Sequence, residues 1–346
     1  MRLLFICKKR MASYGISFGL LNSAKFVCNA LIKNGIECKV VSVVDNNYID
    51  KEVHLFKPTH VIIEAYWVVP SKFDILCKKY PNIKWIIRGH SKIPFFANEG
   101  ISMKWTAEYI QNMKKYNNLY LSFNDKDTCD TIYYGFDYLP IYLPNIYSSP
   151  LTGKLVKRRK WHYYKKGHID IGCFGAIRPM KNTLQQAFAS IKFADKMGKK
   201  LRFHINSGRV EQKGESVIKN LIALFDSSKH ELICHEWLNH RDFIRLIGSM
   251  DMGIQVSLSE SFNIVEADFV YNDILFVGTK DMKWMSFLYR AEPTDINDIV
   301  NKMKFSWFLR HTKFHYINKF FLHLHNIMAT SKWLFFIKKT NRHIVS

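Results

Sequence analysis

The sequence predicts an α/β protein made of two doubly wound, Rossmann-like domains. Two observations lead to this fold class. Short apolar runs alternate with segments of helical periodicity over the first half of the chain, as expected for parallel strands joined by crossover helices. A break that contains proline and serine, at residues 144–150, interrupts this pattern, and the same alternation restarts at residue 169.

The first predicted domain covers residues 1–148 and contains six apolar runs short enough to be buried parallel strands. These predicted strands are residues 3–7, 39–44, 60–64, 85–88, 119–123 and 141–143. Helical periodicity over residues 20–34 and 73–79 predicts helices after the first and the third strand. Sheets of this kind bind ligands beyond the carboxyl ends of their strands, so we expect a functional site there.

A strongly basic linker, residues 149–168, precedes a second domain that covers residues 169–305. The predicted strands of the second domain are residues 169–175, 201–206, 232–235, 252–257 and 274–277, and we expect the last of these to end the sheet. The predicted helices are residues 183–197, 217–224 and 242–249, and a further helix starts at Asn263. Residues 306–346 are rich in basic and aromatic side chains and are expected to form C-terminal helices.

The composition indicates a folded, strongly basic protein. The net charge is +22 and hydrophobic residues make up 48% of the chain, which excludes a disordered protein and indicates a polyanionic partner such as nucleic acid or an acidic membrane surface. An AT-rich coding sequence would explain the excess of Lys over Arg, but not the scarcity of acidic residues. Seven scattered cysteines, none in a C-x-x-C pair, indicate a reduced, cytoplasmic protein without a zinc site. No apolar run has transmembrane length.

The stretch 255–268 has the pattern of a strand, a polar turn and a helix start. Backbone N–H groups at the start of a helix lack intrahelical partners and attract anions, so Ser261, Phe262 and Asn263 are candidate ligands of a phosphate or sugar. Glu260 would repel phosphate and is therefore a candidate acceptor for sugar or ribose hydroxyl groups. A turn whose Glu260 and Asp268 are simply solvated is the structural alternative.

A second candidate element lies at residues 173–182, where a strand ends at Gly175 and a loop carries Arg178 and Lys181 before the next helix. Two cations beside a helix start suit a diphosphate leaving group, which gains negative charge as a glycosidic bond breaks. In a protein this basic, two further cations alone would be weak evidence, and their position after a strand is what makes them candidates.

These two elements carry a resemblance to a known family. Residues 260–268 resemble the E-x7-E element of retaining GT-B glycosyltransferases of the family 4 type, with Asp268 as the second acid. Residues 175–181 resemble the G-R-x-x-x-K element of the same family, with the two cations one residue closer together. Ser261 and Asn263 replace two glycines of the family pattern. The chain also resembles glycosyltransferases that phages encode.

The resemblance implies a GT-B fold, in which two Rossmann-like domains face a central cleft and the C-terminal helix crosses back onto the first domain. It also implies a nucleotide-sugar donor, here expected to be a UDP-sugar, retention of anomeric configuration, and no catalytic metal. Arg178 and Lys181 would hold the donor diphosphate. The resemblance places Trp237 and Leu238 where the family binds the nucleobase, and His90 near the donor sugar. A structural role for His90 is the alternative.

The first domain and the linker contain three further candidate features. Gly15 and Ser17 lie in a loop that resembles the glycine-bearing loop over the donor phosphates, although a plain turn explains it equally well. Asp125 and Asp127 have the D-x-D spacing of a metal site, but we expect them to cap a helix. The basic run of the linker is a candidate nucleic-acid contact: Lys157, Arg158, Arg159 and Lys160.

The acceptor remains open between two classes. The first is DNA with a hydroxymethylated base, as in phage modification systems, which would place the protein in the host cytoplasm and use the basic linker as a DNA contact. The second is a lipid-linked or surface glycan, reached by an enzyme whose basic and aromatic residues contact an anionic membrane. A third, non-enzymatic alternative is a nucleic-acid-binding protein with a degenerate donor site. The presence of both donor elements argues against that alternative.

Overall fold

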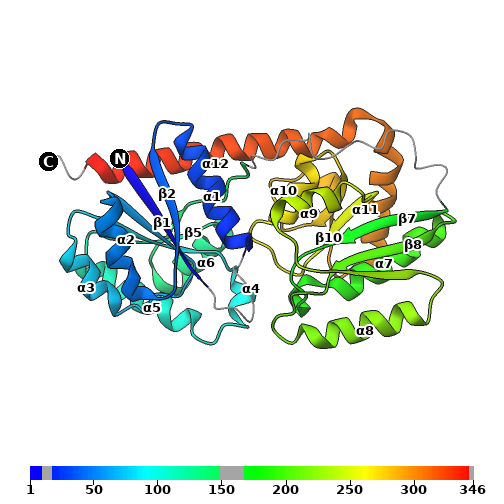
Figure 1. Ribbon diagram of the computed structural model, residues 1–346, viewed down its shortest axis with the longest axis horizontal. Coiled ribbons are helices and arrows are strands. Elements are labelled where there is room, and N and C mark those ends of the chain that lie inside the picture. The colour runs from blue at the N-terminus through cyan, green and yellow to red at the C-terminus, as the bar shows by residue number, and fades with distance from the viewer. Residues whose placement is uncertain (10–17, 149–166, 343–346) are drawn as a thin grey trace. The chain divides into compact units, whose positions relative to one another are not determined.

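The computed structural model describes residues 1–9, 18–148 and 167–342 of the chain, and it divides into two compact units. Unit 1 consists of residues 1–148 together with residues 325–346, and unit 2 consists of residues 149–324. Figure 1 shows the strands and helices of both. Each unit contains one sheet of six parallel strands, so the predicted α/β class is confirmed.

The sheet of unit 1 has the order β2-β1-β3-β4-β5-β6. Its strands are β1 (Arg2–Lys8), β2 (Glu37–Val43), β3 (His60–Glu64), β4 (Lys84–Gly89), β5 (Leu119–Phe123) and β6 (Ile141–Tyr142), close to the predicted ranges. Between them lie α1 (Phe18–Ile32), α2 (Ile49–Phe56), α3 (Lys72–Lys79), α4 (Ile93–Phe96), α5 (Ser102–Lys115) and α6 (Lys126–Phe136). Every residue of β3 and β4 is buried, which explains the continuous apolar pattern of these strands.

Alternating strand residues of unit 1 face two separate cores. One face of β1 contributes Leu4 and Ile6 to a core covered by α2, α3, α5 and α6. The opposite face contributes Leu3 and Phe5 to a core covered by α1 and by the later part of α12 (Ile317–Arg342). The C-terminal helix therefore packs on the first sheet, as the resemblance implied.

The sheet of unit 2 has the order β12-β11-β10-β7-β8-β9. Its strands are β7 (His168–Cys173), β8 (Lys200–Asn206), β9 (Glu231–His235), β10 (Met252–Gln255), β11 (Leu275–Thr279) and β12 (Arg290–Ala291). Its helices are α7 (Thr183–Lys196), α8 (Gly214–Asp226), α9 (His240–Ile247), α10 (Ile264–Tyr271) and α11 (Ile296–Phe308). The expectation that residues 274–277 form the last strand was wrong, because the two-residue strand β12 follows β11 and pairs with it.

Both faces of the second sheet are covered. Helices α7, α8 and α11 bury one face in a core of aliphatic and aromatic side chains. On the other face, Phe174 lies 5.4 Å from Phe243 of α9, and Phe269 of α10 lies 5.3 Å from Phe276 of β11, measured between ring centroids. Gly253 of β10 leaves room for this packing, because a Cβ atom there would lie 2.6 Å from Phe269. Among the described residues, no helix has the length and apolar character needed to cross a bilayer.

Trp333 is the largest fully buried side chain of α12. The side chain is fully buried, its ring lies 5.8 Å from that of Phe5, and its indole N–H donates a 2.8 Å hydrogen bond to the carbonyl of Pro144. Burial of a large aromatic ring together with a satisfied indole N–H stabilises a domain strongly.

Replacing Trp333 by Ala should therefore lower the free energy of unfolding of unit 1 by about 3–5 kcal/mol. The matched control is Phe335→Ala, because Phe335 lies on the same helix and is 70% exposed. That control should change the free energy of unfolding by about 0.5 kcal/mol or less. Chemical denaturation of both variants measures the difference, and equal losses would contradict the assigned packing of α12.

Candidate functional site

Gln255, the last residue of β10, connects the loops that carry the predicted donor-site residues. Its side-chain oxygen accepts hydrogen bonds from Lys181 Nζ, at 3.4 Å, and from Asn263 Nδ2, at 2.8 Å. Its side-chain N–H group donates to the carbonyl of Phe174, which follows β7. The residues predicted at 173–182 and 255–268 are thus brought together at the carboxyl ends of β7 and β10.

Lys181 and Glu260 form an ion pair at this place. The Lys181 ammonium donates to the Glu260 carboxylate, and both side chains are largely buried, with 14% and 9% of their surface exposed. The backbone N–H of Glu260 donates to the Asp281 carboxylate at 3.2 Å. A charge that is largely shielded from water is costly without an opposite charge beside it, so Lys181 and Glu260 each depend on the other here.

Two side chains, Asn182 and Gln186, hold the turn that presents Lys181. The turn is the 3₁₀ helix η2 (Pro179–Lys181), which ends at Asn182 in the left-handed region, at φ 56°. Asn182 Nδ2 donates to the carbonyls of Val256, at 3.1 Å, and Pro293, at 2.8 Å. Gln186 donates to the carbonyl of Lys181 at 2.7 Å and accepts from the N–H of Val256 at 2.8 Å. Polar side chains thereby fasten η2 to the end of β10.

Arg178 lies beside a second group of charged residues, which belongs to the loop after β8. Its guanidinium is 3.5 Å from the Glu211 carboxylate, which also accepts a 2.7 Å hydrogen bond from Arg209 Nε. The Arg209 guanidinium lies 5.0 Å from the centre of the Trp237 ring, within the range of a cation–π interaction. Arg209 was not among the predicted site residues. Its position three residues after β8 was the available signal.

The loop after β7 is also linked to the loop after β9, which contains Trp237 and Leu238. Gly175 has φ 122°, a conformation that favours glycine, and its N–H donates to the Asn206 side chain at 3.0 Å. The same Asn206 side chain donates to the carbonyl of Glu236 at 3.4 Å. Trp237 and Leu238 are each half-buried. The predicted nucleobase loop therefore lies next to the predicted diphosphate loop.

The polar turn before α10 is ordered by Asn263, which is the N-cap of that helix. Asn263 Oδ1 accepts from the N–H of Glu266 at 3.2 Å. Phe262 packs against Trp284, with ring centroids 6.0 Å apart, and Ser261 lies between Phe262 and Glu260. Asn263 stands where the family pattern has a glycine. Its side chain caps α10, so the helix still begins directly after this turn.

Asp268 is not open to solvent. It is 1% exposed and accepts a 2.8 Å hydrogen bond from Nε2 of His240, the first residue of α9. His240 was not among the predicted site residues. Its bond to Asp268 joins two helices that lie on the same face of the sheet.

In unit 1, a buried polar cluster lies at the carboxyl ends of β3 and β4. Arg88 is fully buried and donates to both oxygens of Glu64, at 3.1 Å each, and to the carbonyl of Leu143, at 3.0 Å. His90 Nε2 is hydrogen-bonded to the same Glu64 carboxylate. Burial alone would raise the pKa of Glu64, but the charges of Arg88 and His90 outweigh it and hold that pKa below its ordinary value.

The pKa of His90 is lowered by burial, and the attraction of Glu64 offsets only part of this effect. His90 is therefore a neutral imidazole at neutral pH, and one of its ring nitrogens is hydrogen-bonded to Glu64. His90 is thus held in one orientation at the edge of the sheet where ligands of such folds bind.

Other predicted residues lie elsewhere or outside the described part of the chain. Asp125 caps α6, since its carboxylate accepts from the N–H of Thr128 at 2.8 Å, and Lys92 lies 3.6 Å from Asp127. Within residues 1–9, 18–148 and 167–342, no group of three or more His, Cys, Asp or Glu side chains is placed to hold a metal ion. The candidates outside the described residues are Gly15, Ser17, Lys157, Arg158, Arg159 and Lys160.

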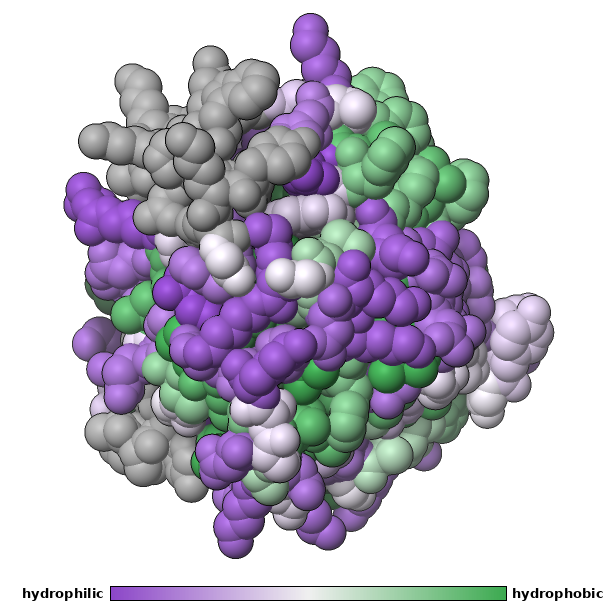
Figure 2. All heavy atoms as spheres, turned by 90° about the vertical axis from the view of Figure 1, so that its right-hand side faces the viewer, coloured by the Kyte–Doolittle hydropathy of each residue, from purple (hydrophilic) through white to green (hydrophobic). Residues whose placement is uncertain are grey.

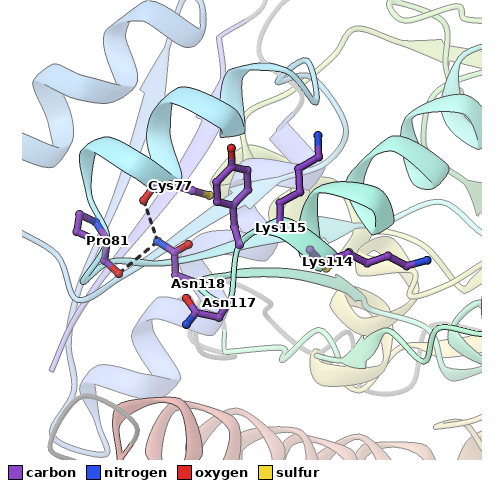
Figure 3. A pocket seen from close by; sticks show the side chains of 8 residues that line it. Cys77, Pro81, Lys114, Lys115, Asn117 and Asn118 are labelled. Carbon is purple, nitrogen blue, oxygen red and sulfur yellow. Dashed lines mark hydrogen bonds between the residues drawn. The ribbon is translucent and has the colours of Figure 1, made fainter.

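A hollow of about 380 Å³ lies in unit 1 where α3 and α5 end. Figure 3 shows Asn118 hydrogen-bonded within it, with the Lys114 and Lys115 side chains extending away. Asn118 Nδ2 lies within 3.3 Å of the carbonyls of Cys77 and Pro81, both of which precede β4. The hollow therefore lies at the amino-terminal edge of the sheet, and Asn118 has a structural role.

Comparison with known proteins identifies the fold. No protein-family model and no curated protein sequence matches the chain. Among solved structures, sucrose-phosphate synthase from Thermosynechococcus elongatus matches with a TM-score of 0.70 at 9% identity, covering 100% of both chains. An alpha-glucosyltransferase in complex with UDP and a 13-mer DNA containing an HMU base matches with a TM-score of 0.62 at 12% identity, covering 100% of this chain and 99% of that one.

A third similar structure is a UDP-forming trehalose-phosphate synthase from Burkholderia xenovorans, with a TM-score of 0.63 at 11% identity and 100% coverage of both chains. These neighbours are glycosyltransferases of the GT-B fold, and the likeness extends over the whole chain. The predicted GT-B fold is therefore confirmed.

Replacing Glu64 by Ala would leave Arg88 buried without its partner, which should cost about 3–5 kcal/mol of stability. Since the pKa of Glu64 is held below its ordinary value, the contribution of the pair is present above the ordinary Glu pKa and is lost as the pH falls through the lowered one. Denaturation as a function of pH measures both effects. The control Glu37→Ala removes an exposed pair with Arg2 and should cost about 1 kcal/mol or less. A similar cost for both variants would contradict the assignment.

Proposed function

We propose that the protein is a glycosyltransferase that moves a hexose from a UDP-sugar to an acceptor hydroxyl group. The observation that supports this most is the Lys181–Glu260 pair, attached through Gln255 to the carboxyl end of β10 and lying on the loops whose sequence resembles both donor elements of the family. A cation paired with a carboxylate beside further cations suits a ligand that contains both phosphate and hydroxyl groups.

In the proposed mechanism, the donor diphosphate replaces Glu260 as the partner of Lys181. The freed Glu260 carboxylate then accepts hydrogen bonds from hydroxyl groups of the sugar. As the glycosidic bond breaks, negative charge grows on the diphosphate, and Lys181, Arg178 and the neighbouring Arg209 stabilise it. The sequence resemblance further assigns His90 to the donor sugar and implies retention. The acceptor oxygen then attacks on the face from which the diphosphate leaves, and its proton passes to the departing phosphate.

DNA with a hydroxymethylated base is the acceptor that we favour. The net charge of +22 and the basic run at residues 157–160 suit a polyanion. One structure of similar fold, the alpha-glucosyltransferase, was solved with a DNA that contains an HMU base. A hydroxymethyl group that projects from a base is a hydroxyl acceptor of the required kind.

A membrane-associated acceptor is the second candidate, because unit 2 exposes several phenylalanines next to cations. Lys302 donates to the carbonyl of Phe287 at 3.2 Å, and Phe305 lies 6.4 Å from Phe314 between ring centroids, which places these elements side by side. Figure 2 shows a hydrophobic region beside a broad hydrophilic band on one face of unit 2. The exposed aromatic side chains are Phe287, Phe308, Phe314, Phe320 and Phe321. Such a surface suits anionic headgroups.

Lys181→Ala and Glu260→Ala should each lower the rate of sugar transfer by about 100-fold or more, because each removes a charge that the transition state uses. Thermal unfolding should show that both variants stay folded. Lys196→Ala is the matched control, since Lys196 is an exposed cation on α7. Near-normal transfer by the Lys181 or Glu260 variant would contradict the donor-site assignment.

The acceptor is identified by incubating the protein with labelled UDP-sugars and three acceptors: DNA that contains 5-hydroxymethylpyrimidine, unmodified DNA, and a lipid extract. We expect label in the hydroxymethylated DNA alone, because only that DNA offers an exposed base hydroxyl group. Label in the lipid alone would replace the DNA proposal with the membrane one. Hydrolysis of the donor without transfer would retain the enzyme class and reject all three acceptors.

A further inference from the structure

Glu266, on α10, is a buried acid that the proposed mechanism does not use. Its side chain is fully buried, and neither carboxyl oxygen has a hydrogen-bond partner among the described residues. Glu266 stands three residues after the N-cap Asn263, where a glutamate commonly bonds back to the N–H of the cap. Here it makes no such bond, so helix capping does not account for its orientation.

The carboxyl group of Glu266 packs against Gly278 of β11. A Cβ atom on Gly278 would lie 2.8 Å from Oε1 and 3.0 Å from Oε2 of Glu266, so the absence of a side chain at Gly278 is what makes room for the acid. Gly278 pairs with Gln255 in the sheet, and Gln255 bonds Lys181. Glu266 therefore packs on β11, the strand next to the one that carries Gln255.

Three charged groups act on Glu266 from the elements around it: Glu260 on the loop after β10, Lys181 in η2, and Arg290 on β12. Burial and the charge of Glu260 raise the pKa of Glu266 well above its ordinary value, and the two cations offset only part of this. Two further buried polar groups in this region, the hydroxyls of Ser257 and Thr279, also lack partners among the described residues. No described group donates a hydrogen bond to the Glu266 carboxyl group, and ionising a buried carboxyl group that accepts no hydrogen bond is costly.

We propose that Glu266 is a positioning residue of the donor site that acts through Lys181 and Glu260 and must remain a neutral carboxylic acid. A neutral Glu266 leaves Lys181 with one carboxylate partner, which a diphosphate can replace. An ionised Glu266 would add a second negative charge near Lys181 and would oppose the binding of the diphosphate. The inference rests on the proposed function, because it takes the diphosphate of a nucleotide sugar as the ligand.

The test is the affinity for UDP, measured by calorimetry from mildly acidic to alkaline pH, in the wild type, Glu266→Gln and Glu266→Met. As Glu266 ionises, the wild type should lose about tenfold in affinity, the effect of one added charge at a distance of roughly 10 Å in a protein. Both variants carry no charge at this position and should keep their affinity over the same range. Glu215→Gln, an exposed acid on α8, is the control and should behave as the wild type.

Infrared spectroscopy gives a measurement that does not depend on the donor. The wild type should show the carbonyl band of a protonated carboxylic acid at neutral pH, and Glu266→Gln should lack it. Absence of that band in the wild type would overturn the inference. The inference would also be overturned if both variants lost affinity for UDP at alkaline pH as the wild type does. It would likewise be overturned if both variants bound UDP more weakly than the wild type at every pH.

The two proposals fail in different ways. A wild type that binds no UDP would overturn the proposed function and, with it, this role of Glu266. A wild type that binds UDP while the variants show the same pH dependence would overturn the role of Glu266 alone. Glu266→Met also guards against a folding defect, because an apolar side chain of similar length is tolerated in a buried position.

Discussion

The side-chain amide of Gln255 joins three segments that are far apart in the sequence, and the geometry of the candidate donor site depends on it. The amide bonds the carbonyl that follows β7, the ammonium of Lys181 and the N-cap of α10. A buried amide that satisfies both its donor and its acceptor groups is costly to displace, so it orders loops that apolar packing alone would leave free. The charges of the site are therefore placed by a neutral residue, and their chemistry follows from that placement.

In unit 1, a charged residue orders the surrounding segments in the same way. Arg88 is fully buried and bonds Glu64 and the carbonyl of Leu143, and its guanidinium lies 5.2 Å from the Trp333 ring. It thereby connects the carboxyl ends of two strands to the C-terminal helix. His90 takes its orientation from the same Glu64 carboxylate. In both units, one buried polar side chain at the carboxyl edge of the sheet orders the surrounding segments.

The fold was predictable because buried parallel strands are continuous apolar runs, as β3 and β4 show. β12 escaped prediction because Arg290 and Ala291 do not form an apolar run, whereas β6, of the same length, lies within one. Lys181 and Glu260 were found by their spacing in the chain, but their direct pairing is a tertiary contact that spacing does not reveal. Arg209 and Gln255 were missed for the same reason, since their importance arises from Trp237 and Lys181. Glu266 could be recognised only once Gly278 was known to lie against it.

The division of α12 between the two units has a consequence for the synthesis of the protein. Residues 325–342 cover the core to which β1 contributes Leu3 and Phe5. All of unit 2 lies between β1 and residues 325–342 in the sequence. On the ribosome, unit 2 is therefore complete before unit 1 can close. Until Trp333 emerges, the part of the first sheet's face that α12 covers stays exposed to chaperones and to aggregation while all of unit 2 is translated.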